Sequence, residues 1–190
     1  MKELIKKRIQ ESIDVKKKVI ETQADTIARM VEEITSSFKQ NGKVIFFGNG
    51  GSAADSQHVA AEFIGRFERE RKSLPAIALT TDTSILTALG NDYGFESVFS
   101  RQLEGIGKKG DVAVAISTSG NSPNVLEGVR QAKKMGIKTL AFTGRDGGKL
   151  AKAGDVSLIV PSDNTARIQE AHICIFHIIC ELVENNFSKT

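Results

Sequence analysis

The chain has 190 residues, of which 40% are hydrophobic, enough for one domain to bury a core. Its 26 basic and 23 acidic residues give a net charge of +3, which argues against nucleic acid as a partner because nucleic-acid binding needs a concentrated basic face. No apolar run is long enough to cross a bilayer, and the first residues lack a signal-peptide core, so we expect no membrane partner. Cys174 and Cys180 lie too far apart on one expected helix to pair, which favours a reducing, cytoplasmic location.

Residues 1–40 have the pattern of one long helix. Apolar side chains recur there mostly three, four or seven residues apart, without proline or glycine, at Leu4, Ile5, Ile9, Ile13, Ile20, Ile27, Met30, Val31, Ile34 and Phe38. A helix of this length with a modest apolar stripe needs a partner surface. That surface is either its own domain or another copy of the chain, and we favour the second. We therefore predict an oligomerisation helix over 1–40 followed by the main body over 41–190, within a single structural domain.

Five apolar runs without polar alternation follow the Asn41-Gly42 break. They predict buried strands at 44–47, 76–79, 112–116, 139–142 and 156–160. Helical patterns lie between and after them, at 52–68, 83–106, 123–135, 147–153 and 165–187. This alternation predicts a three-layer, doubly wound α/β fold with a five-stranded parallel sheet and helices on both faces. Ligands of such sheets bind beyond the carboxyl ends of the strands, so we expect the functional residues in the loops at that edge.

The loop after the third predicted strand reads Ser117-Thr118-Ser119-Gly120-Asn121-Ser122 and opens a helix at Pro123. A helix N-terminus offers unpaired N–H groups and the positive end of a dipole, and the hydroxyls add neutral donors. Gly120 lets the backbone approach an anion or turn with positive φ. The loop therefore indicates a phosphate site, although a plain turn with an N-cap has the same residue types.

The loop after the first predicted strand reads Gly48-Asn49-Gly50-Gly51-Ser52 and leads into a helix that carries His58 and Glu62. The dinucleotide pattern G-x-G-x-x-[GA] is met, but the acidic residue that would hold the ribose should lie about 20 residues on, at the end of the second strand. Here that strand ends in Thr80-Thr81-Asp82, about 30 residues on, so the match is weak. His58 and Glu62 are four residues apart and share one helix face. They can bind a metal, act as an acid/base pair or form an ordinary surface contact.

Three further stretches hold polar residues. Asn91 and Asp92, between glycines, predict a turn or contacts with sugar hydroxyls. Residues 143–148 predict a structural turn. The last helix carries His172 and His177 in apolar surroundings, as core residues or functional groups. His177 lies about 80° around and 12 Å along an ideal helix from Gln169, so spacing alone favours His172 over His177.

Taken together, four segments resemble one family. They are Gly48-Asn49-Gly50-Gly51-Ser52-Ala53-Ala54-Asp55, Gly90-Asn91-Asp92-Tyr93-Gly94-Phe95, Ile116-Ser117-Thr118-Ser119-Gly120-Asn121-Ser122 and Ala166-Arg167-Ile168-Gln169-Glu170. The family is that of the phosphoheptose (sedoheptulose 7-phosphate) isomerases, within the sugar-isomerase (SIS) domain group. The resemblance runs from about residue 42 to 183. It implies a homotetramer with active sites near subunit interfaces. It also implies conversion of sedoheptulose 7-phosphate to D-glycero-D-manno-heptose 7-phosphate, the first step toward bacterial nucleotide-activated heptose.

The resemblance also assigns residues. It implies that Ser117, Thr118, Ser119 and Ser122 hold the phosphate, and that Asn49, Gly50, Gly51, Asn91 and Asp92 contact the sugar. It implies one zinc per subunit on His58, Glu62, Gln169 and His177, which overrides the preference for His172. The span from Gln169 to His177 then requires a subunit boundary or a distorted helix.

For chemistry through an enediol we assign Glu62 as the base and His177 as the proton donor or as part of the metal site. A zinc-bound carboxylate is a poorer base than a free one, so zinc is either catalytic, with Glu62 moving during turnover, or mainly structural.

Two other functions are compatible with parts of the sequence. SIS relatives that bind the bacterial replication initiator share the Gly-Asn-Gly-Gly-Ser loop, but differ at positions matching Ser119, 90–92 and His177. A sugar-phosphate sensor would not need the pair Glu62 and His177.

Overall fold

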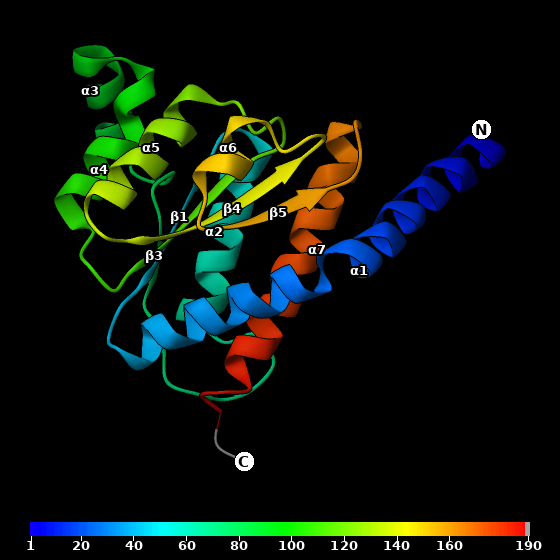
Figure 1. Ribbon diagram of the computed structural model, residues 1–190, viewed down its shortest axis with the longest axis horizontal. Coiled ribbons are helices and arrows are strands. Elements are labelled where there is room, and N and C mark those ends of the chain that lie inside the picture. The colour runs from blue at the N-terminus through cyan, green and yellow to red at the C-terminus, as the bar shows by residue number, and fades with distance from the viewer. Residues whose placement is uncertain (189–190) are drawn as a thin grey trace.

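The computed structural model describes residues 1–188 and contains a five-stranded, fully parallel sheet in the order β2-β1-β3-β4-β5 (Figure 1). The strands are β1 (Val44–Gly48), β2 (Ala76–Ala78), β3 (Val112–Ser117), β4 (Lys138–Gly144) and β5 (Val156–Val160). Each predicted strand is present, and the predicted fold class is confirmed. β1, β3 and most of β4 are buried on both faces, as their unbroken apolar runs indicate.

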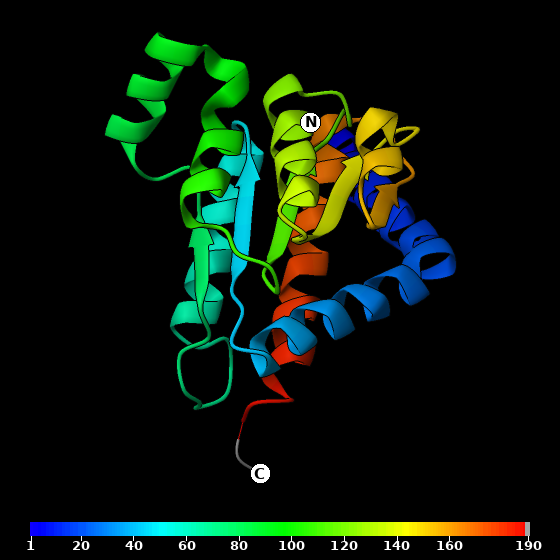
Figure 2. The same ribbon diagram turned by 60° about the vertical axis from the view of Figure 1, so that its left-hand side comes forward.

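Helices cover both faces of this sheet. They are α1 (Lys2–Lys39), α2 (Gly51–Ile64), α3 (Thr83–Tyr93), α4 (Val98–Ile106), α5 (Pro123–Lys134), α6 (Gly148–Ala153) and α7 (Thr165–Glu184), with a 3-10 turn η1 at Phe95–Ser97. One core, which includes Phe46 and Phe142, lies between the sheet and α1, α2 and α7. The other, which includes Phe47 and Leu103, lies between the sheet and α4, α5 and α6 (Figure 2).

The chain order reverses between β1 and β3. From β1 the chain passes through α2 to β2 on one side, whereas β3 lies on the other side of β1 and leads on to β4 and β5. At the carboxyl edge Gly48 pairs with Ile116, so the loops that leave β1 and β3 are neighbours. Such a reversal leaves a crevice between the two loops, and in sheets of this kind it is the place where ligands bind.

The stretch 83–106 is not one helix as predicted. The chain breaks at Gly94, which has φ +83°, and resumes through η1 into α4. A positive φ of this kind suits glycine, and it ends α3. Asn91 and Asp92 therefore lie in the last turn of a helix, and the predicted turn is wrong by a few residues. No residue of α3 is buried. α2 also ends earlier than predicted, at Ile64 instead of residue 68.

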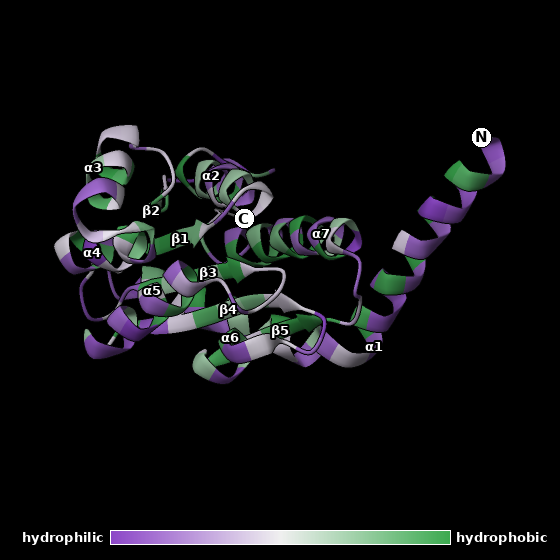
Figure 3. Cartoon of the chain, turned by 90° about the horizontal axis from the view of Figure 1, so that it is seen from above, coloured by the Kyte–Doolittle hydropathy of each residue, from purple (hydrophilic) through white to green (hydrophobic). Residues whose placement is uncertain are grey.

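The long N-terminal helix divides into two parts. Its second part packs on the sheet and α7 and buries residues such as Met30, Ile34 and Phe38. Its first turns extend away from the body, and Leu4 and Ile9 are more than half exposed (Figures 1 and 3). Only part of the apolar stripe of α1 is therefore buried against its own domain. Within residues 1–188, no helix combines the length and the apolar character that a membrane span requires.

Candidate active site

The serine-rich loop after β3 forms a compact cluster of hydroxyl groups. Ser117 Oγ lies 2.9 Å from Ser122 Oγ and 3.4 Å from Ser119 Oγ. Ser122 is the N-cap residue of α5, and Pro123 occupies its first turn. Thr118, between them, is partly buried. The hydroxyls thus gather where a helix of 12 residues presents its N-terminus, an arrangement suited to a phosphate.

The loop after β4 supports this cluster from outside. Gly120 has φ +64°, and a Cβ there would lie 2.1 Å from Gly147 O, so only glycine fits. The N–H of Leu150 donates to Gly120 O at 2.9 Å, and the N–H of Lys149 donates to Asn121 Oδ1 at 3.2 Å. The expected structural turn within residues 143–148 lies between the end of β4 and the start of α6, and in addition this region fixes the backbone of the hydroxyl cluster.

The loop after β1 is joined to α5 by two amide side chains. Asn49 Nδ2 donates to Asn124 Oδ1 at 2.8 Å, and Asn124 Nδ2 donates to Asn49 Oδ1 at 2.9 Å. Gly50, with φ +57°, turns the chain into α2. Asn124 is buried, and its Oδ1 also accepts the N–H of Val125. Asn124 was not predicted from the sequence, where its only local signal is a polar residue on the otherwise apolar face of α5.

Helices α2 and α7 run side by side and meet at two levels. At the first turn of α2, the amide of Gln169 lies so close to Gly51 that a Cβ there would be 2.4 Å from Gln169 Nε2. Seven residues further along α2, His58 Nε2 lies 2.9 Å from His177 Nε2. Because α7 is one continuous helix, these two levels are about 12 Å apart along it. A distorted helix therefore does not bring Gln169 to His177.

Three of the residues singled out from the sequence meet at the second level. The Nε2 atom of His58 lies 3.4 Å from Glu62 Oε1 and 2.9 Å from His177 Nε2. At this separation one imidazole donates its proton to the other. The side chain of Glu62 is 23% exposed and that of His58 47% exposed, so solvent reaches the group. It offers a carboxylate and two imidazoles at one place, the components of acid/base chemistry.

The same three side chains have the right donors for zinc, but the spacing of the two imidazole nitrogens is that of a hydrogen bond. Two nitrogens on one tetrahedral zinc, each about 2.0–2.1 Å from it, would lie about 3.3 Å apart, whereas the imidazole nitrogens are 2.9 Å apart. Among residues 1–188, no set of three or more His, Cys, Asp or Glu side chains has metal-binding geometry. Gln169 lies at the other level, with Gly51.

His172, which spacing alone favoured, is a core residue. It is fully buried, with its ring edge-on to Phe142, and its Nε2 donates to Thr143 O at 2.9 Å. Burial lowers the pKa of His172 to about 4, although the hydrogen bond to Thr143 acts the other way. The imidazole is therefore neutral, and its Nδ1 has no partner. The choice of His177 over His172 agrees with this geometry.

Asp55, one turn before His58 on α2, was not singled out from the sequence. One of its carboxylate oxygens, Oδ2, is buried and lacks a hydrogen-bond partner. Burial raises the pKa of Asp55, and the charge of His58 opposes that change. A carboxyl group with a raised pKa next to a histidine is typical of functional sites.

Asn91 and Asp92 are not joined to these loops by any hydrogen bond in the part of the chain described. Both are exposed on α3, and Asn91 Nδ2 donates to Asp92 Oδ1 at 2.8 Å. Their predicted contact with sugar stays a prediction.

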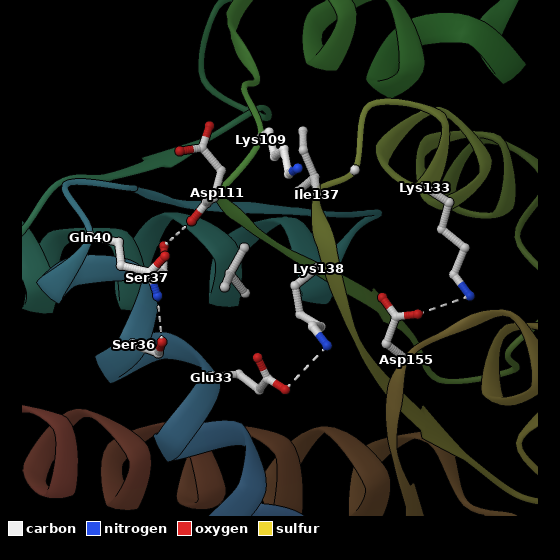
Figure 4. A pocket seen from close by; sticks show the side chains of 13 residues that line it. Glu33, Ser36, Ser37, Gln40, Lys109, Asp111, Lys133, Ile137, Lys138 and Asp155 are labelled. Atoms are coloured by element: carbon white, nitrogen blue, oxygen red, sulfur yellow. Dashed lines mark hydrogen bonds and ion pairs between the residues drawn. The ribbon is translucent and has the colours of Figure 1, made fainter.

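A cavity of about 680 Å³ lies at the opposite, amino-terminal edge of the sheet (Figure 4). Four of its charged side chains pair with each other: Lys138 with Glu33 at 3.3 Å and Lys133 with Asp155 at 3.1 Å. None of the predicted site residues lines it, and we place the site at the carboxyl edge.

This combination of fold and strand-end loops is that of a SIS domain, and the SIS-domain family model matches residues 9–144. A phosphoheptose isomerase of Aquifex aeolicus is 56% identical over 184 residues, covering 97% of this chain and 96% of the relative. One from Helicobacter pylori is 50% identical over 186 residues, with 98% and 97% covered. The structure of a phosphoheptose isomerase from Neisseria gonorrhoeae has a TM-score of 0.92 at 45% identity, with 97% and 98% covered.

The chain therefore belongs to the phosphoheptose isomerase family, as the sequence motifs indicated. It is a sugar-phosphate isomerase. These relatives support an enzyme and not an initiator-binding SIS protein.

Proposed function

We propose that the chain isomerises sedoheptulose 7-phosphate to D-glycero-D-manno-heptose 7-phosphate, the entry to nucleotide-activated heptose in bacteria. The observation that carries the proposal is the hydroxyl cluster of Ser117, Ser119 and Ser122 at the N-terminus of α5. It offers a neutral, donor-rich cradle to a phosphate group. The name shared by relatives that are 50% identical or more over most of the chain supports the choice of sugar.

Ketose–aldose interconversion moves a proton between C1 and C2 and passes through an enediol. Glu62 is the base that takes the proton from carbon, and His177 gives a proton to oxygen. Asn49, Gly50 and Gly51 orient the sugar next to the phosphate loop, and we include Asn91, Asp92 and Thr118 among the substrate contacts. The hydrogen bond of His58 to His177 and its 3.4 Å contact with Glu62 support this pairing, because they bring the two side chains to one place.

Zinc is part of the proposal. His58, Glu62 and His177 supply two imidazole nitrogens and a carboxylate, donors that zinc accepts, and Gln169 is the fourth predicted ligand. When bound, zinc would polarise the sugar oxygens as a Lewis acid.

We further propose a homotetramer in which each active site combines two copies. The phosphate loop and Gln169 lie at one level of the α2–α7 pair, and His58, Glu62 and His177 lie about 12 Å away along it. Exposed Ile178 and Leu182 on α7, and the exposed start of α1, offer apolar surface for such contacts. Both cysteines are free, which supports a cytoplasmic enzyme.

The decisive experiment incubates the purified protein with sedoheptulose 7-phosphate and follows the aldose phosphate. Product that disappears with a chelator and returns with zinc supports both the reaction and the metal. Product unaffected by chelator keeps the reaction and removes zinc from it. No product, with zinc supplied, refutes the proposed substrate.

A further inference from the structure

The segment between α2 and β2, residues 65–75, contains no helix or strand, yet it is anchored by a buried ion pair. Arg71 lies in this segment and Glu184 is the last residue of α7. Their side chains are 1% and 2% exposed, and Arg71 Nε lies 3.1 Å from Glu184 Oε1. That N–H is not aligned for a hydrogen bond, so the attraction between these two atoms is ionic. Buried charges persist only when other bonds satisfy them.

Glu184 is satisfied by the main chain of the segment. Its Oε1 accepts the N–H of Phe67 at 2.9 Å, and its Oε2 accepts the N–H groups of Glu68 and Arg69, each at 2.8 Å. Burial alone would raise the pKa of Glu184, but these three bonds and the charge of Arg71 hold the pKa below its usual range. The ionised carboxylate thus fixes three consecutive residues to the end of α7.

Arg71 is satisfied at the end of α2. Its Nη2 donates to Glu62 O at 2.9 Å, and its Nη1 donates to Phe63 O at 2.9 Å. The last carbonyl groups of a helix have no partner within it, so the guanidinium acts as a cap for α2. Through this cap it holds the main chain of Glu62 itself.

The fixed segment also reaches His177. The ring of Phe67, whose N–H is held by Glu184, lies 5.5 Å from the imidazole of His177, at an angle of 33°. The segment therefore contacts both functional residues. Arg71 bonds the main-chain carbonyl of Glu62, and Phe67 packs against the ring of His177. Neither Arg71 nor Glu184 is accessible to a substrate, because both side chains are almost fully buried.

We propose that Arg71 and Glu184 are positioning residues that hold Glu62 and His177 in register for proton transfer. The effect on turnover rests on the proposed function. Displacement of reacting groups by about 1 Å can lower a rate about 100-fold. Residues outside the site that fix its geometry, such as Arg71 and Glu184, therefore have a measurable effect on catalysis.

The test uses the full chain with Glu184→Gln, Arg71→Lys, Arg71→Met and Phe67→Leu, well below the lowest melting temperature. We expect Glu184→Gln and Arg71→Met to lower kcat about tenfold or more, with KM changed by no more than about twofold, because geometry and not binding is lost. Arg71→Lys keeps the charge but cannot bond Glu62 O and Phe63 O together, so it should rescue part of kcat. The imidazole ¹⁵N resonances of His58 and His177 should move in every variant.

Asp111→Asn is the matched control. Asp111 is also a buried carboxylate: it accepts the N–H groups of Lys43 and Lys108 at 3.0 and 2.9 Å and pairs with Lys43 Nζ at 2.6 Å. It lies at the opposite edge of the sheet (Figure 4). The change should lower the melting temperature as Glu184→Gln does, while kcat and the imidazole resonances stay unchanged.

Two results would overturn the proposal. One is that Asp111→Asn and Glu184→Gln, when they lower the melting temperature equally, also lower kcat equally. The other is a set of unchanged His58 and His177 resonances in Glu184→Gln and Arg71→Met. If the unaltered protein does not turn over sedoheptulose 7-phosphate, the proposed function fails. The imidazole ¹⁵N resonances still decide whether Arg71 and Glu184 position His177.

Discussion

The side-chain amides of Asn49 and Asn124 donate to each other across the carboxyl ends of β1 and β3, at 2.8 and 2.9 Å. This pair joins the glycine-rich loop to the helix that presents the hydroxyl cluster. Asn124 is buried, so the loss of either side chain would leave the amide of the other without its hydrogen-bond partner.

Asn124→Asp removes the donor and leaves two acceptors facing each other at this junction. We expect stability to fall by about 1–3 kcal/mol, more above the pKa of the new carboxyl group, and KM for the sugar phosphate to rise. Denaturant unfolding and steady-state kinetics measure the two effects. Gln131→Glu, the same amide-to-carboxylate change further along α5, serves as the control and should leave KM unchanged. An unaltered KM in Asn124→Asp would show that the pair does not position the loops.

Glu62→Gln and His177→Gln should each lower kcat by about 10²–10⁴, the usual contribution of a general acid or base. Substrate should still bind, because the hydroxyl cluster is intact, and isothermal calorimetry would show it. His172→Gln is the control for the histidine, since His172 lies in the core and not with His58. Near-native turnover in Glu62→Gln would make the base assignment wrong.

Mixing two inactive variants tests whether a site combines two copies. Chains with Ser119→Ala lack part of the phosphate loop, and chains with Glu62→Gln lack the base. If each site uses one group from each copy, dissociation and reassembly of the mixture should produce some sites with both groups intact. Activity should then return to a fraction of the native value. A mixture as inactive as its components, despite confirmed mixed oligomers, would place each site within one chain.

His172 makes stability depend on pH. Its pKa is about 4 when folded and about 6.5 when unfolded, so between these values the unfolded chain binds more protons. Stability is therefore full above about pH 6.5 and falls by up to about 1.4 kcal/mol per pH unit down to about pH 4. His172→Gln should remove this slope in urea unfolding measured from pH 7 to 4.5. The pKa values of Glu184 and Asp155 are lowered, so these carboxylates make stability depend on pH mainly below this pH range. Their effect is the same in the unaltered protein and in His172→Gln. Equal slopes in the two proteins would contradict the burial argument.

Most of the fold could be predicted, because buried parallel strands have continuous apolar sequences that need no knowledge of their neighbours. The hydroxyl loop after β3 could be found for the same reason, since it follows a strand and opens a helix. The break at Gly94 was missed, because an apolar pattern continues across it and a glycine does not reveal its φ in advance. The position of Asn91 and Asp92 was missed with it.

The contacts within the site could not be predicted by spacing on one helix. His177 was compared with Gln169 on its own helix, whereas the residue it meets is His58 on α2. The family resemblance, not geometry, selected it. Asn124 and the pair of Arg71 and Glu184 depend likewise on residues far away in the sequence, and local patterns carry no information about such partners.

The two contact levels between α2 and α7 also limit how this sequence can change its length. Gly51 meets Gln169 and His58 meets His177, so seven residues of one helix are matched to eight of the other. Deleting one residue between Gly51 and His58 would turn His58 by about 100° away from its partner while the start of the helix stayed in place. Such a chain could still fold and bind phosphate, and yet have no imidazole pair. An insertion or deletion between the two contact levels of either helix is therefore incompatible with the imidazole pair.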